Sequence, residues 1–114
     1  MSNIPYTVEQ VIEFCRDGKH EIVIVNRKDR KNQLFRESVG ITYAEEQEEI
    51  RKLRKEFLYK GPFLDKDYPD NYLYEFHKEV YGKWCYIKLT IVDESVVVKV
   101  ISFHESEGTI YEQI

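Results

Sequence analysis

Two apolar runs near the end of the chain, joined by a short polar turn, most constrain how this sequence can fold. Residues 84–92 read WCYIKLTIV and residues 96–104 read VVVKVISFH, with Asp93, Glu94 and Ser95 between them. β-branched and aromatic residues dominate both runs, and such runs bounded by turn residues are typical of β-strands. They therefore predict an antiparallel hairpin that forms the last two strands of a sheet.

The length of this turn decides which side chains share a face, because successive strand residues point to opposite faces. A two-residue turn (93–94) gives one purely apolar face and places His104 away from Tyr86 and Lys88. A three-residue turn (93–95) places His104 on their face. A β-bulge reconciles the two arrangements, since it reverses the facing of the residues beyond it. The turn lacks the Asn-Gly or Asp-Gly pair that would fix its length, so all three arrangements stay open.

Two capping boxes mark helices in the first half of the chain. In each, a threonine is followed three residues later by Gln or Glu, and apolar positions then recur at helical spacing. They begin at Thr7 and Thr42, and they predict helices over 8–17 and 43–55. Between them the sequence predicts a strand at 20–25 and a weaker helical segment around 34–39.

After the second capped helix the apolar period changes to two. The sequence then predicts strands at 57–60, 72–81, 84–92 and 96–104, with an Asp-rich loop over 64–71. Helices followed by a meander of consecutive strands predict an α+β fold, with two or three N-terminal helices packed on a curved, mainly antiparallel sheet. A chain of 114 residues suits a single domain over 1–114.

Charge and cysteine content narrow the function classes. A formal net charge of −4 and an isoelectric point near 5.4 argue against a general nucleic-acid binder. Basic residues nevertheless gather at 27–31 and 51–55, where they form either a local basic groove or solvated faces of mixed charge. Cys15 and Cys85 are too few and too far apart for a metal site, so we expect buried free thiols.

The N-terminal residues lack the pattern of an export signal, and no apolar run approaches membrane length. We therefore expect a soluble, cytoplasmic protein that makes no contact with membranes. The sequence indicates no metal ion and no cofactor.

The strand residues Lys60, Glu75, Tyr86 and His104 carry chemistry that suits metal-independent cleavage of RNA. Such cleavage needs a base for the 2′-hydroxyl, cations for the phosphate and an acid for the departing 5′-oxygen. His104 can serve as acid or base near neutral pH, and Glu75 is a candidate base with His77 as its alternative. Tyr86 can donate a hydrogen bond or stack on a base.

Basic side chains complete this hypothesis. Lys60 and Lys88 can hold the phosphate, and Arg51, Arg54 and Lys55 can follow the RNA backbone. Each residue also has a structural interpretation. The histidine can be an ordinary strand-end residue, the tyrosine can pack at the rim of the sheet, and the lysines can keep edge strands soluble.

Three short segments resemble the C-terminal sheet of bacterial toxins of the RelE/ParE superfamily, in particular the MqsR-like group. They are FLYK (57–60), CYIKLTI (85–91) and VISFHE (100–105). The resemblance implies site roles for Lys60 and Tyr86, and it places His104 where the family carries a lysine. A glutamine on the preceding strand of the family has no clear equivalent, and Glu75 and His77 are the candidates for its place.

The resemblance implies a toxin of a type II toxin–antitoxin system, an mRNA-cleaving endoribonuclease that acts alone or on the ribosome and is neutralised by a cognate antitoxin. One alternative is a non-catalytic or gyrase-binding toxin on the same fold. Another is a protein of a different α+β family that shares only this layout. Apolar residues of the first helix and of the tail GTIYEQI (108–114) can contact an antitoxin, form a homodimer or complete the core.

Overall fold

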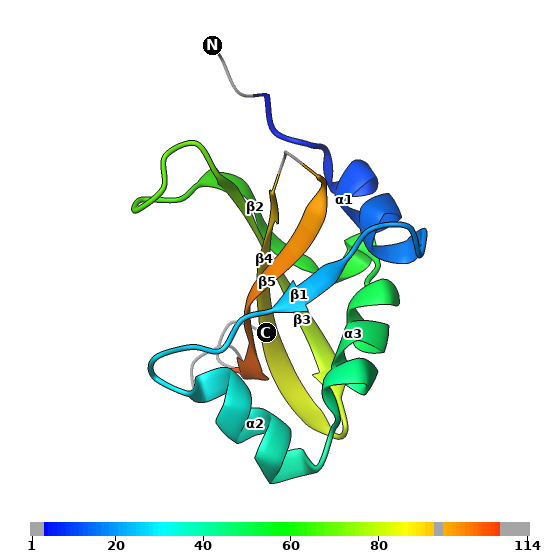
Figure 1. The fold of residues 1–114 in the computed structure, drawn as a ribbon, viewed down its shortest axis with the longest axis vertical. Coiled ribbons are helices and arrows are strands. Elements are labelled where there is room, and N and C mark those ends of the chain that lie inside the picture. Colours follow the sequence, from blue (N-terminus) through cyan, green and yellow to red (C-terminus); the bar gives the residue numbers. More distant parts are fainter. Residues whose placement is uncertain (1–3, 93–94, 108–114) are drawn as a thin grey trace.

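The computed structural model describes residues 4–92 and 95–107 (Figure 1). Within these ranges, three α-helices, one short 3₁₀ segment (η1) and five strands follow one another. The elements are α1 (Val8–Arg16), β1 (Ile22–Ile24), α2 (Lys31–Val39), α3 (Tyr43–Arg51), η1 (Lys55–Phe57), β2 (Leu58–Leu64), β3 (Tyr72–Val80), β4 (Lys83–Val92) and β5 (Val97–Glu105).

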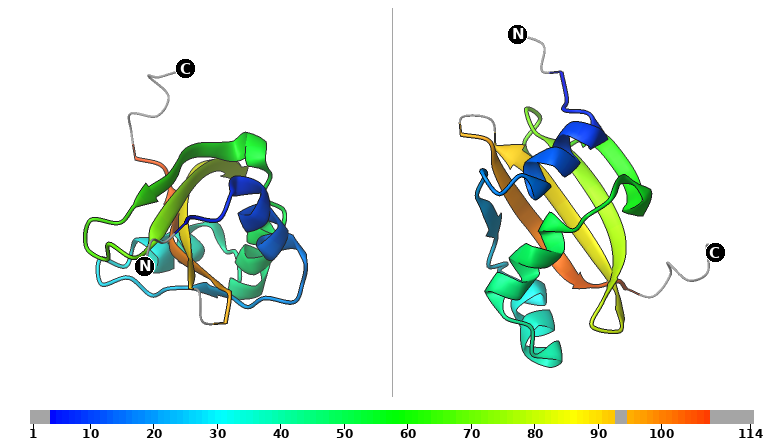
Figure 2. Two further views of the ribbon diagram at one scale, coloured as in Figure 1. Left: turned by 90° about the horizontal axis from the view of Figure 1, so that it is seen from above. Right: turned by 90° about the vertical axis from the view of Figure 1, so that its right-hand side faces the viewer.

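The strands form one sheet in the order β1-β5-β4-β3-β2. Strands β2 to β5 pair antiparallel, whereas β1 pairs parallel with β5, so the sheet is mixed. Helices α1 and α3 lie over one face of the sheet, and α2 packs beside β5 (Figure 2). The predicted α+β fold with N-terminal helices is confirmed, although the predicted curvature is not a clear feature of the sheet.

Both predicted capping boxes form. The hydroxyls of Thr7 and Thr42 accept backbone N–H groups three residues ahead, each at 3.1 Å, and the Gln10 and Glu45 side chains accept in return at 2.8 Å. The prediction of a helix as far as residue 55 was wrong, because α3 ends at Arg51. Its last turn tightens, with Leu53 N donating to Ile50 O at 3.1 Å.

The core lies between the sheet and the helices. Val11, Ile12 and Cys15 of α1 are buried in it, so the apolar stripe of this helix completes the core. Cys15 and Cys85 are buried free thiols, as predicted, and burial raises the pKa of each to about 12. The tail at 108–114 lies outside the described residues. None of the helices in the described ranges is long and apolar enough to cross a membrane.

The β4–β5 hairpin contains the bulge that the sequence left open. Val92 pairs with Val97, so the connection is longer than both turn lengths considered, and residues 93–94 within it lie outside the described ranges. Leu89 pairs with Val100, but the register then shifts, and Lys88 pairs with Ser102. The shift leaves Ile101 as the extra residue. Beyond it, the pairing sets Tyr86 opposite His104 and reverses which face β5 side chains take.

Strand β2 continues to Leu64, although the sequence predicted its end before Gly61-Pro62. Gly61 has φ +126°, a backbone conformation that side chains disfavour, and a Cβ built there would lie 2.6 Å from the Leu73 carbonyl oxygen. The strand passes this point because glycine lets its backbone lie directly against β3.

We expect Gly61→Ala to destabilise the fold, by about 1–3 kcal/mol from the backbone conformation alone. The contact with the Leu73 carbonyl adds to this loss. Gly40→Ala is the matched control, because Gly40 has φ +73° and no atom within 4 Å of a built Cβ. Urea denaturation would measure both, and an equal loss in the two variants would show that the close approach to β3 does not matter.

Candidate functional site

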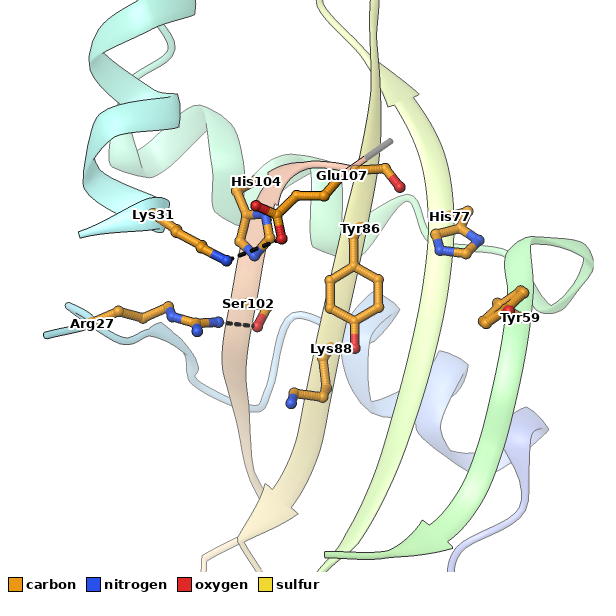
Figure 3. A pocket seen from close by; sticks show the side chains of 10 residues that line it. Arg27, Lys31, Tyr59, His77, Tyr86, Lys88, Ser102, His104 and Glu107 are labelled. Carbon is orange, nitrogen blue, oxygen red and sulfur yellow. Dashed lines mark hydrogen bonds and ion pairs between the residues drawn. The ribbon is translucent and has the colours of Figure 1, made fainter. Parts of the chain in front are cut away.

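A pocket of about 320 Å³ opens on the face of the sheet opposite α1 and α3 (Figure 3). Strands β2 to β5 form its floor, and the connection between β1 and α2 borders one side. Its lining residues are Arg27, Lys31, Tyr59, His77, Tyr86, Lys88, Ser102, His104, Ser106 and Glu107.

Four aromatic side chains cross the floor of the pocket, and we call them the aromatic row. Pairing sets His77 beside Tyr86 and Tyr86 beside His104, with ring centroids 5.8 Å apart in each case. Tyr59 of β2 extends the row, with its ring centroid 4.4 Å from that of His77. The row places one imidazole on each side of the Tyr86 phenol. Rings of this kind can stack on an unpaired base.

A second set of polar residues lies on the same strands, two residues along from the aromatic row. Glu75 pairs with Lys88, and Lys88 pairs with Ser102. The Tyr86 hydroxyl donates to Glu75 Oε2 at 2.6 Å. Burial raises the pKa of Tyr86, and the hydrogen bond and negative charge of Glu75 raise it further. Tyr86 is therefore protonated at neutral pH, with its hydroxyl directed at Glu75.

Three cations come to the pocket from three different elements. Arg27, from the β1–α2 connection, donates from Nη1 to Ser102 Oγ at 2.5 Å and is held by both carboxylate oxygens of Asp29 at 2.9 and 2.7 Å. Lys31, at the start of α2, forms an ion pair with Glu107 at 3.0 Å. Lys88 rises from β4 (Figure 3). This arrangement can receive a phosphate, which arginine and lysine recognise through charge and hydrogen bonds.

His104 is held in one tautomer by the backbone. The residue is only 8% exposed, and its Nδ1 lies 3.0 Å from the Glu105 carbonyl oxygen. A carbonyl oxygen can only accept, so Nδ1 carries the proton and Nε2 of the neutral ring is a free acceptor. Burial lowers the pKa of His104, and the positive charges of Arg27 and Lys31 lower it as well. The opposing hydrogen bond to Glu105 and the charge of Glu107 are weaker than the burial effect. His104 is therefore a neutral base at neutral pH.

His77 is equally buried but has a different electrostatic neighbour. Burial lowers its pKa, while the negative charge of Glu75 acts in the opposite direction. The two histidines thus differ in their charged neighbours, since His104 faces cations and His77 lies near a carboxylate. Burial favours the neutral form of both rings, and the nearby carboxylate makes His77 the better candidate to carry a proton.

The structure brings together only part of the set predicted from sequence. Tyr86, Lys88 and His104 line the pocket, and Glu75 contacts it through Tyr86. Lys60 of β2 pairs with Glu75 of β3, but its ammonium lies over the Phe63 ring, 4.3 Å from the centroid. Lys60 therefore does not line the pocket.

The predicted RNA-backbone residues lie near α1 instead. Arg51 donates to the Cys15 carbonyl oxygen at 3.4 Å, while Arg54 and Lys55 form exposed ion pairs with Glu56 and Glu9. The pocket's own cations, Arg27 and Lys31, come from the other basic cluster at 27–31. That cluster was the only sequence signal for them, and nothing in the sequence indicated the contributions of Ser102, Ser106 and Glu107.

No protein-family model matches the chain, and comparison with curated proteins finds no relative. The pocket is therefore the basis for assigning the chemistry of this protein.

Proposed function

We propose that the protein is a metal-independent endoribonuclease that cleaves mRNA by attack of a ribose 2′-hydroxyl on the adjacent phosphate. The observation that carries this proposal is the pair of buried histidines on either side of Tyr86, in a pocket with three cations. The resemblance of three segments to RelE/ParE-type toxins supports a more specific proposal. We propose that the enzyme is the toxin of a type II toxin–antitoxin system, acts in the cytoplasm and is neutralised by a cognate antitoxin.

The cations bind the phosphate in this scheme. Arg27 and Lys88 lie beside Ser102, whose hydroxyl can donate a further hydrogen bond to a phosphate oxygen. Lys31 is bound to Glu107, whose carboxylate a substrate phosphate can replace. Positioned cations stabilise the charge that grows on the phosphoryl oxygens, and they do so best in a site that excludes water.

The two histidines divide the proton transfers. Nε2 of neutral His104 removes the 2′-hydroxyl proton, the 2′-oxygen bonds to phosphorus, and the bond from phosphorus to the 5′-oxygen breaks. His77, favoured in its protonated form by Glu75 and by the bound phosphate, gives its proton to the departing 5′-oxygen. The products are a 2′,3′-cyclic phosphate and a free 5′-hydroxyl, and the aromatic row stacks the neighbouring base.

A pair of matched oligonucleotides tests the proposal. The purified protein should cleave a short unstructured RNA, leave the same RNA intact when one 2′-hydroxyl is deoxy at the cleaved step, and produce a cyclic phosphate detectable by mass spectrometry. Cleavage of the deoxy substrate would exclude attack by the 2′-hydroxyl. Growth arrest on expression, without RNA cleavage in cells or in vitro, would favour a toxin that acts by binding a partner.

The different positions of the two lysines give a second prediction. We expect Lys88→Ala to reduce RNA affinity and cleavage more than Lys60→Ala, because only Lys88 lines the pocket. Loss of a hydrogen bond to a charged group costs about 1.5–3 kcal/mol, or roughly 10- to 150-fold in binding. Fluorescence anisotropy with the deoxy RNA measures binding without cleavage. A larger loss in Lys60→Ala would show that RNA follows β2 rather than the pocket.

A further inference from the structure

Strand β1, which pairs with the edge of β5, ends halfway along β5. Beyond this point the buried side-chain amide of Asn32 forms hydrogen bonds with β5 instead. Strand β1 is short, and it pairs only with Val98, Lys99 and Val100 of β5. The part of β5 that carries the pocket residues extends beyond this pairing. Asn32, in the first turn of α2, lies beside it and is completely buried.

The Asn32 amide makes three hydrogen bonds at this point. Its Nδ2 donates to the Val25 carbonyl oxygen and to the Ile101 carbonyl oxygen, each at 3.0 Å. Its Oδ1 accepts from the Phe103 backbone N–H at 2.8 Å. The amide therefore binds β5 on both sides of Ser102, and one of its partners is the extra residue of the bulge.

The bulge decides which side chains of β5 reach the pocket. With the bulge, Ser102 and His104 face the pocket, while Phe103 lies in the core and stacks on Phe35 at 5.9 Å between centroids. A hairpin without the extra residue would exchange these faces, because a shift of one residue turns every side chain over. It would then place Phe103 in the pocket and His104 in the core.

We propose that Asn32 is a positioning residue for the site: its amide holds the β5 bulge and thereby sets His104 and Ser102 toward the pocket. Its effect on catalysis rests on the function proposed above, whereas its effect on His104 does not. No other side chain of this size supplies two donors and one acceptor from a single planar group. Aspartate keeps the acceptor but turns a negative oxygen toward two carbonyl oxygens, and alanine removes all three bonds.

The first test reads His104 directly. Long-range ¹H–¹⁵N NMR spectra identify the tautomer and follow the titration of each of the three histidines. In Asn32→Ala we expect His104 to lose its single Nδ1–H tautomer and to titrate at higher pH than in the wild type, because its burial is reduced and the substitution adds no charge. The charged groups that face it, Arg27, Lys31 and Glu107, are all retained in this variant. His77, two strands away, should keep its wild-type titration curve.

Two further variants separate positioning from general destabilisation. Asn32→Asp provides the tautomer reading if Asn32→Ala does not fold. Gln47→Leu is the matched control. It removes a hydrogen bond of 2.8 Å from the Gln47 side-chain amide on α3 to the carbonyl oxygen of Ile22 on β1, which pairs with the other end of β5. It should leave the His104 spectrum unchanged.

The RNA assay then completes the test. Misplacement of a catalytic group by about 1 Å can cost about 10²-fold in rate, so we expect a loss of that order in kcat/KM for the Asn32 variants and little change for Gln47→Leu. An unchanged His104 spectrum in a folded Asn32 variant would overturn the proposal. If the Asn32 variants change the His104 spectrum but the wild type does not cleave RNA, the positioning role stands and the proposed function is rejected.

Discussion

Replacing His104 with glutamine is expected to lower kcat for RNA cleavage by about 10²–10⁴-fold, the usual contribution of a general base. Glutamine approximates the size of the ring and can still form hydrogen bonds, but it cannot take up a proton. Single-turnover cleavage of a labelled RNA measures the loss, and binding to the deoxy RNA shows whether the pocket still forms. The matched control is His20→Gln, since His20 lies outside the pocket and pairs with Asp17.

The pH dependence gives this prediction its sign. Burial lowers the pKa of His104 and of His77 in the free protein, so each changes charge below the ordinary value of about 6.5. A base must be neutral, so kcat/KM should rise as pH increases through the pKa of His104. An acid must be protonated, so kcat/KM should fall as pH increases through the pKa of His77. The expected profile is a bell with its maximum on the acid side of neutrality.

Each limb of the bell belongs to one histidine. His104→Gln should remove the rise on the acid side, and His77→Gln should remove the fall on the alkaline side. A profile that keeps both limbs in either variant would show that other groups transfer the protons. An unchanged kcat in His104→Gln would contradict the assignment of the base altogether.

The second large effect is expected at an ion pair far from the pocket, between α2 and α3. Arg36 Nε donates to Glu46 Oε1 at 2.7 Å, and the Glu46 side chain is completely buried. Among the described residues, Arg36 Nη2 and Glu46 Oε2 are buried without a hydrogen-bond partner. Removing one member of a buried pair typically costs 3–5 kcal/mol, so we expect Arg36→Met to lower the free energy of unfolding by about that amount.

A double variant makes this prediction sharper. Arg36→Met combined with Glu46→Leu should recover most of the stability, because a buried pair can be replaced by apolar residues at little or no cost. Denaturant unfolding of the wild type, both single variants and the double variant forms a complete cycle. If the losses of the two single variants simply add in the double variant, the pair does not act as a unit.

The stability that this ion pair gives should also depend on pH in a definite direction. Burial raises the pKa of Glu46, and the bond to Arg36 only partly offsets this. A carboxyl whose pKa is raised on folding favours the folded state when protonated, and this contribution is lost as pH rises through the raised pKa. Without Arg36 the pKa should rise further, so Arg36→Met should lose least stability in acid and most at neutral pH.

The elements that rest on local patterns were predictable from sequence. The capping boxes at Thr7 and Thr42 and the apolar spacing after them located α1 and α3, and the runs of β-branched and aromatic residues located β3, β4 and β5. The hairpin register was not predictable, since VVVKVI offers almost no alternation of polar and apolar residues. Its bulge is held by Asn32, which lies 69 residues away from Ile101 in the chain.

The composition of the pocket was only half predictable for the same reason. Tyr86, Lys88 and His104 belong to one hairpin, so local reasoning could bring them together. Arg27 and Lys31 reach the pocket only because β1 lies parallel to β5, and no local pattern signals that pairing. The register irregularities of β2 and the contact of Lys60 with the Phe63 ring explain why this lysine does not line the pocket.

The parallel pairing of β1 with β5 also has a consequence for how the protein folds. Strands β2 to β5 follow one another and can form by short loop closures, whereas Ile22 and Val98 must meet across most of the chain. Contacts between residues far apart in sequence form slowly, because a large loop must close before they contribute. The meander can therefore precede the β1–β5 contact along the folding route. A refolding chain would then form the floor of the pocket, with Lys88, before Arg27 and Lys31 reach its side.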